Sequence, residues 1–130
     1  KLKRAYKGNI FDASCLTNDD INTTVFNYIE QKGIKNIVVT GAPFSYFYFI
    51  TELKKKINDL NIILDYRDLW TNSKYNFGEN VLKTQGAHRY EVEKKMEATA
   101  LNNCNRVFVV SRDLKEILAM KHSFLILSTF

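Results

Sequence analysis

The stretch that decides the fold of this 130-residue chain covers residues 61–70 and reads Asn-Ile-Ile-Leu-Asp-Tyr-Arg-Asp-Leu-Trp. Its first half is a continuous apolar run with β-branched residues, which is typical of a strand covered on both faces. Its second half places four notable side chains where that strand ends: Asp65, Arg67, Asp68 and Trp70. In open parallel sheets, ligands bind beyond the carboxyl ends of the strands. A charged group beside an apolar core is costly unless it is paired with another group or serves in binding or catalysis. Chemistry is therefore expected here.

Apolar runs and helical patterns alternate on either side of this stretch. Strands are predicted over residues 34–40, 106–110 and 123–129. Helices are predicted from a cap at Thr17 or Asn18 to Gly33, over residues 44–59, over residues 86–103, and after a cap at Ser111. This order implies right-handed crossovers and a parallel sheet. We predict a single Rossmann-like α/β domain over residues 1–130, with about four strands and helices on both faces.

Composition excludes several classes of protein. The chain is 45% hydrophobic and 25% charged, which is typical of a globular protein rather than a disordered one. No apolar run approaches the roughly 18 to 20 residues that span a bilayer, and no apolar segment of a signal peptide follows the basic residues 1–7. Cys15 and Cys104 fit no metal-ligand spacing, so buried thiols and a cytoplasmic location are expected.

The net charge of +5 is scattered along the chain. No nucleic-acid-binding signature accompanies it, so no nucleic-acid partner is expected. Lysines at residues 54–56 lie off the apolar stripe of their predicted helix. They indicate either a solvated face or peripheral contact with an anionic membrane face, which vesicle binding sensitive to salt would reveal.

Asp65, Arg67 and Asp68 are the candidate catalytic residues. Alternation along a strand puts Asp65 and Arg67 on one side, and Tyr66 and Asp68 on the other. One carboxylate then pairs with Arg67, while the second is available as a base or as a ligand for a hydroxyl group. The alternative is a structural Asp–Arg pair that ties the strand end to the next helix. No metal is expected, because the spacing is not Asp-x-Asp and no third ligand is near.

Three further places are candidates for substrate binding. Gly41, Ala42 and Pro43 join a strand to a helix, where backbone N–H groups could receive an anion or a sugar hydroxyl; the alternative is an ordinary turn. Neither Gly-x-Gly-x-x-Gly nor Gly-Lys-Ser/Thr is present, so these residues form neither familiar phosphate-binding loop. Trp70 is either a wall for a sugar ring or a plug in the core. Ser111 and Arg112 leave the third strand toward the same crevice, or are a plain N-cap and a surface arginine.

Taken together, these motifs resemble the N-terminal domain of GT-B glycosyltransferases of family 4, over about residues 36–127. The matching features are a small-residue and proline turn after a strand (residues 39–43), a strand ending Asp-aromatic-Arg-Asp-x-Trp (residues 63–70), a helical Glu97 eight residues before Asn105, and a strand ending Val-Ser (residues 107–111). Two departures are Phe47, where members often have a histidine, and Cys104-Asn105, where they have Ala-Asp. The second change is expected to affect packing only.

The resemblance implies an enzyme of polysaccharide biosynthesis that moves a sugar from a nucleotide-sugar donor to an acceptor without a bound metal or cofactor. It implies that residues 41–43, Asp65, Arg67, Asp68 and Ser111 face the cleft between two domains. The family's first βα units and its nucleotide-binding half have no counterpart here, so the chain is expected to be the later part of the N-terminal domain, inactive without the missing remainder of the enzyme.

The resemblance also has a consequence for partners. The strand at residues 37–39 would lack its natural neighbour, and a bare apolar edge favours self-association. The alternative function is a non-catalytic Rossmann-like binding or regulatory module. A receiver domain, one such module, would need an acidic pair after its first strand and a phosphorylatable Asp after its third, and this chain does not show that arrangement.

Overall fold

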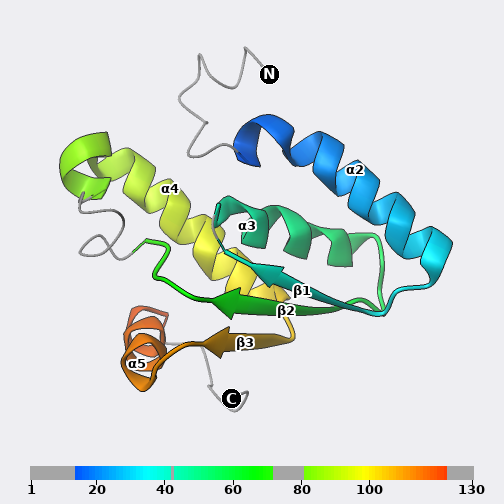
Figure 1. The fold of residues 1–130 in the computed structure, drawn as a ribbon. Coiled ribbons are helices and arrows are strands. Elements are labelled where there is room, and N and C mark those ends of the chain that lie inside the picture. The colour runs from blue at the N-terminus through cyan, green and yellow to red at the C-terminus, as the bar shows by residue number, and fades with distance from the viewer. Residues whose placement is uncertain (1–13, 42, 72–80, 123–130) are drawn as a thin grey trace.

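The structure is a computed structural model and describes residues 14–41, 43–71 and 81–122 of the chain. Three parallel strands form one sheet in the order β1-β2-β3, with helices between and around them (Figure 1). The elements are α2 (Ser14–Lys32), β1 (Asn36–Thr40), α3 (Ser45–Thr51), the 3-10 helix η1 (Glu52–Lys55), β2 (Asn61–Tyr66), α4 (Val81–Asn103), β3 (Arg106–Val109) and α5 (Arg112–Lys121).

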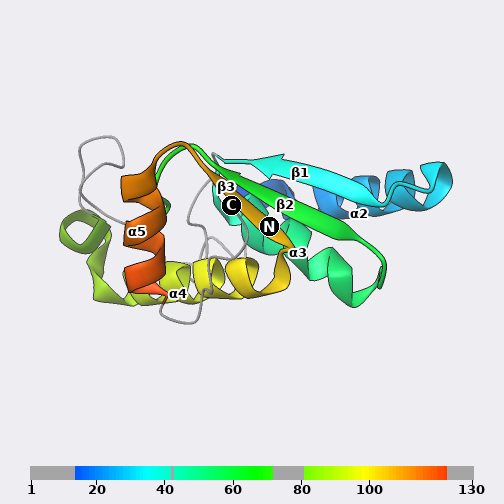
Figure 2. The ribbon, with the colours of Figure 1, turned by 90° about the horizontal axis from the view of Figure 1, so that it is seen from below.

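The α/β class and the parallel sheet predicted from the sequence are confirmed. In the register, Val39 of β1 lies opposite Leu64 of β2, and Leu64 lies opposite Val107 of β3. Paired residues of neighbouring strands point to the same face. The face that carries these three side chains is the inner face, and α3 and α4 lie on that side of the sheet (Figure 2).

The prediction of helices on both faces is not met in the described part of the chain. On the outer face, the side chains of Val38 and Phe108 are 60% and 47% exposed. The physical reason is the strand order: right-handed crossovers between strands that lie side by side in chain order place every connecting helix on one face. A second helical layer requires the strand order to reverse. The predicted fourth strand, residues 123–129, lies outside the described residues.

The bounds of the first helix differ from the prediction at one end. Helix α2 begins at Ser14, before the predicted cap at Thr17, since no glycine or proline in this stretch stops the helix. Its end agrees with the prediction: Gly33 adopts a φ of 62°, and the backbone N–H of Ile34 donates to the carbonyl of Ile29 at 3.1 Å. This is the hydrogen bond of a Schellman cap, which favours glycine at that position.

The other two long helices also differ in their bounds. Helix α3 and η1 end at Lys55 rather than residue 59, yet Ile57 and Leu60 of the predicted apolar stripe remain buried. Helix α4 begins at Val81 rather than residue 86. No helix among the described residues is long and apolar enough to cross a bilayer.

An aromatic cluster lies beneath the end of β2. The ring of Phe44 stacks on the rings of Tyr66 and Trp70, with centroids 6.2 Å and 6.3 Å away. Phe47 is fully buried, and its ring centroid lies 4.7 Å from that of Tyr66. Offset or tilted aromatic pairs of this kind add stability beyond the area that they bury. The cluster therefore gives the C-terminal end of β2 a rigid base.

Asn105 links three elements at the opposite end of the sheet. Its side-chain oxygen accepts from the backbone N–H of Ile62 at 2.9 Å and from Nζ of Lys54 at 2.7 Å, and its own N–H donates to the carbonyl of Ile62 at 2.8 Å. The role of this position is therefore polar as well as apolar, and the expected effect of the change from Ala-Asp to Cys104-Asn105 stays a prediction. A polar side chain here ties η1 to the paired strands β2 and β3.

Replacing Asn105 by alanine should lower the free energy of unfolding by about 1–2 kcal/mol, because the Ile62 N–H loses its acceptor. Urea denaturation followed by circular dichroism measures this. The matched control is Asn102→Ala, at an exposed position of α4, with an expected change within about 0.5 kcal/mol. Equal effects of the two substitutions would contradict this role of Asn105.

Candidate functional site

The rim of the sheet, where β1 and β2 end, holds the predicted Asp–Arg pair. Nε of Arg67 donates to Oδ2 of Asp65 at 3.1 Å, and the hydroxyl of Thr40 donates to the same oxygen at 3.3 Å. The Arg67 side chain is 67% exposed and that of Asp65 is 20% exposed. An ion pair this open to water contributes little to stability, so its main effect is to fix the Asp65 carboxylate between two donors.

Asp68 lies apart from this pair. Strand β2 ends at Tyr66, so alternation no longer governs the residues that follow. The prediction that Tyr66 and Asp68 share a side is wrong: Tyr66 is fully buried and Asp68 is exposed. No described residue makes a hydrogen bond or ion pair with the Asp68 carboxylate. Among the described residues, Asp68 is thus an exposed rim carboxylate without a partner.

Trp70 belongs to the core rather than to a surface. Its side chain is 3% exposed and stacks on Phe44 within the aromatic cluster. Of the two roles predicted for it, only the plug fits this burial, since a wall for a sugar ring must present a face to solvent. The chain turns inward after Asp68, and Leu69 and Trp70 are buried together.

The turn after β1 has a packing role. The N–H of Gly41 donates to the carbonyl of Asp65 at 3.4 Å, Pro43 has no N–H, and Ala42 lies outside the described residues. A Cβ on Gly41 would lie 2.4 Å from the ring of Phe44, so glycine is needed for that ring to pack. The observed contacts fit the ordinary turn, and no N–H of Gly41 or Pro43 is available to an anion.

Ser111 and Arg112 lie where β3 leads into α5. The side chain of Ser111 accepts from the backbone N–H of Leu114 at 3.2 Å, which confirms the predicted N-cap. Both Ser111 and Arg112 are exposed. The structure therefore supports a structural role for Ser111 and leaves the Arg112 guanidinium at the surface.

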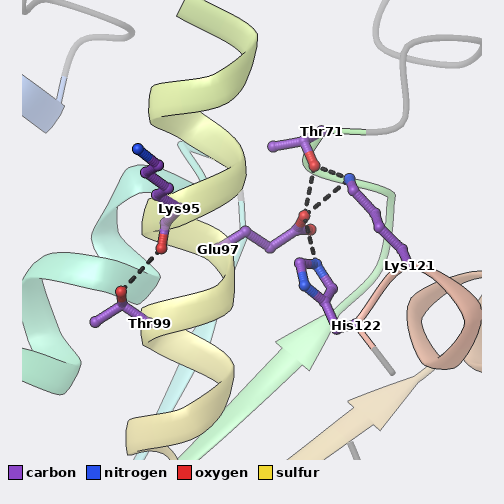
Figure 3. Close-up of polar contacts among 6 residues, drawn as sticks. All are labelled: Thr71, Lys95, Glu97, Thr99, Lys121 and His122. Carbon is purple, nitrogen blue, oxygen red and sulfur yellow. Dashed lines mark hydrogen bonds and ion pairs between the residues drawn. The ribbon is translucent and has the colours of Figure 1, made fainter. Parts of the chain in front are cut away.

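A buried polar cluster behind the rim was missed by the sequence reasoning. Glu97 of α4 is fully buried, and three side chains contact its Oε2 (Figure 3). The hydroxyl of Thr71 donates to it, Nζ of Lys121 lies 2.9 Å away, and Nε2 of His122 lies 3.1 Å away. We call Thr71, Glu97, Lys121 and His122 the Glu97 cluster. It joins α4 to the segment after β2 and to the end of α5.

The charge state of the cluster follows from its contacts. Burial alone would raise the pKa of Glu97, but hydrogen bonds from His122, Thr71 and Lys121, with the Lys121 charge, outweigh it and hold the pKa below its ordinary value. The carboxylate is therefore ionised at neutral pH. Burial raises the pKa of the Tyr66 hydroxyl well above its ordinary value, and the charge of Glu97 raises it further, so Tyr66 stays neutral.

One sequence signal points to the cluster. Glu93 and Glu97 lie on the same helical stripe as the apolar residues Met96 and Ala100, and all four are buried. A carboxylate on an apolar stripe needs a buried partner. The partners themselves are too far along the chain for any spacing pattern to indicate them. His122, the C-cap residue of α5, contacts Glu97 from the end of that helix.

Chemistry based on metals or thiols receives no support from the described residues. No group of three or more His, Cys, Asp or Glu side chains among them converges to hold a metal ion. Cys104 is a free thiol whose pKa is raised by burial to about 11, so it is protonated at neutral pH.

No protein-family model, curated protein or solved structure matches this chain.

Replacing Gly41 by alanine should lower the free energy of unfolding by about 1–3 kcal/mol, because the new methyl group must displace the ring of Phe44. Chemical denaturation of Gly41→Ala, Phe44→Leu and the double variant measures this as a double-mutant cycle. The cost of Gly41→Ala should shrink in the Phe44→Leu background. An unchanged cost would show that Phe44 packing is not the reason for glycine.

Proposed function

We propose that this chain is the acceptor-side segment of a glycosyltransferase, which transfers a sugar from a nucleotide-sugar donor to a hydroxyl group of an acceptor. The observation that supports this is the pair of carboxylates at the sheet rim. Asp65 is fixed by Arg67 and Thr40, whereas Asp68 is exposed and has no partner among the described residues. The resemblance of residues 36–127 to the N-terminal domains of GT-B enzymes supplies the reaction class.

In this proposal Asp68 accepts a hydrogen bond, and then the proton, from the acceptor hydroxyl as that oxygen attacks the sugar. A positioned carboxylate accelerates such a step by about 10²–10⁴-fold. Arg67 holds Asp65 in place and brings positive charge to the rim, where the negative charge of the donor phosphates approaches. The nucleotide contacts come from the remainder of the enzyme, so this segment alone is inactive.

The alternative function is a non-catalytic Rossmann-like binding module. It is favoured by the outer face of the sheet, where Val38, Phe108 and Val110 are exposed.

Peripheral membrane contact through residues 54–56 is less well supported. Lys54 donates to Asn105, Lys55 pairs with Glu52, and Lys56 lies 5.7 Å from the ring centroid of Phe26. We therefore propose a cytoplasmic enzyme whose contact with the inner membrane face, if vesicle binding detects it, is weak and sensitive to salt.

Asp68→Asn in the full-length protein should lower kcat by about 10²-fold or more, since the amide cannot accept the proton. Asp65→Asn should lower it less, because Asp65 positions rather than reacts. Glycosyl transfer from radiolabelled nucleotide sugars measures both. Asp59→Asn, at the other end of β2, is the control and should leave turnover unchanged. Unchanged turnover in both rim variants would remove the catalytic assignment.

We also propose self-association through β1. Within the described part of the chain β1 pairs only with β2, and its free edge borders an apolar groove of about 320 Å³ lined by α2, α3 and β1. The strand carries no charged residue and no proline that would protect such an edge.

Replacing Val38 by lysine should reduce self-association, because a charge at the strand centre opposes edge pairing. Analytical ultracentrifugation of the chain at several concentrations measures the change. Lys35→Ala, outside the strand, serves as the control. If the unmodified chain is a monomer at every concentration tested, the proposal of self-association fails.

A further inference from the structure

Glu97 holds the C-terminal end of the rim segment. Residues 67–70 lie between Tyr66, the last residue of β2, and Thr71. The hydroxyl of Thr71 donates to Oε2 of Glu97. At the other end of the segment, the hydroxyl of Tyr66 is buried, and it makes no hydrogen bond among the described residues. The Glu97 carboxylate therefore fixes the point at which the chain returns to the core after Arg67 and Asp68.

The same carboxylate holds α5. Lys121 and His122 come from the last turn and the C-cap of this helix, and both reach Oε2 of Glu97 (Figure 3). At its other end, α5 begins with Arg112 beside the end of β3. The orientation of the exposed Arg112 relative to β2 thus depends on where α5 is fixed. Two parts of the rim, contributed by different elements, share one buried anchor.

The anchor depends on charge. The Lys121 ammonium forms an ion pair with this carboxylate; its side chain is 13% exposed, and Nζ lies 5.9 Å from the ring centroid of Tyr90. The other groups that face the carboxylate are His122, Thr71 and Tyr66, and Cys104 acts on Tyr66. Glu93, one turn earlier on α4, is buried as well. If the Glu97 carboxyl group were neutral, the ammonium group of Lys121 would lose its negative partner at Oε2. A largely buried charge without a partner is costly.

We propose that Glu97 is a positioning residue whose buried carboxylate fixes segment 67–70 and α5 together, and so sets the arrangement of Arg67, Asp68 and Arg112 at the rim. The inference rests on the proposed function only for what the rim does; the coupling itself is a property of this chain. Glu97 is fully buried and acts on the rim through Thr71 and through the end of α5.

The test is nuclear magnetic resonance of the isotope-labelled chain of 130 residues. In the unmodified chain, the amide signals of residues 67–71 and of residues 120–122 should shift with pH at one shared midpoint. That midpoint lies below 4.5, since the pKa of Glu97 is lowered on folding, and the coupling is complete above that value and lost as the pH falls through the midpoint. Packing without shared charge would give no common titration.

Three variants separate the outcomes. In Glu97→Gln the shared titration should disappear, and the signals of Arg67, Asp68 and Arg112 should move at pH 7. Thr71→Val should move the signals of residues 67–71 and leave those of residues 120–122 in place. Glu91→Gln, an equal charge change at an exposed position of α4, should preserve the shared titration. Unmoved signals of Arg67 and Asp68 in Glu97→Gln would overturn the proposal.

Failure of this proposal differs from failure of the proposed function. Should Glu97→Gln not fold, Thr71→Val, which removes the hydroxyl group that donates to Glu97, still decides the question: no change at residues 67–70 in this variant would overturn the proposal. The resonance experiment uses no substrate. Suppose that the shared titration is lost in Glu97→Gln and that the unmodified full-length protein transfers no sugar. These results together would refute sugar transfer and leave the positioning role intact.

Discussion

The buried negative charge of Glu97 is the constraint on which the C-terminal half of the described fold depends. A carboxylate removed from water must be met by hydrogen bonds and positive charge, or it takes up a proton. Here the required groups are Thr71, Lys121 and His122, which precede or follow Glu97 by more than twenty residues. Helix α4, the end of the β2 segment and the end of α5 can satisfy the charge only by assembling at one point.

Strand β2 connects this buried assembly to the polar rim of the sheet. It pairs with a neighbour on each side, and its side chains alternate between a buried inner face and a partly exposed outer face. Tyr66 points into the aromatic cluster, while Asp65, one residue earlier, receives Thr40 and Arg67 at the surface. The buried inner layer therefore fixes where Asp65 lies on the outer face.

Local signals were sufficient for much of this fold. Apolar runs located all three described strands, Gly33 ended the first helix, and Ser111 capped the last. The sequence also indicated the Asp65–Arg67 pair, which forms although Arg67 lies one residue beyond the end of β2. Features that depend on distant residues were not accessible in this way. Burial of Trp70 depends on Phe44, the Glu97 cluster joins segments far apart in the chain, and the bare outer face follows from strand order.

The most direct test of this account is the charge state of Glu97 itself. The side-chain carboxyl carbon of Glu97, observed by ¹³C resonance as a function of pH, reports its pKa without reference to any activity. The account predicts a carboxylate that is ionised at neutral pH and titrates below the ordinary value of 4.5. A pKa above that value would show that burial outweighs the contacts from Thr71, Lys121 and His122, and would contradict the account.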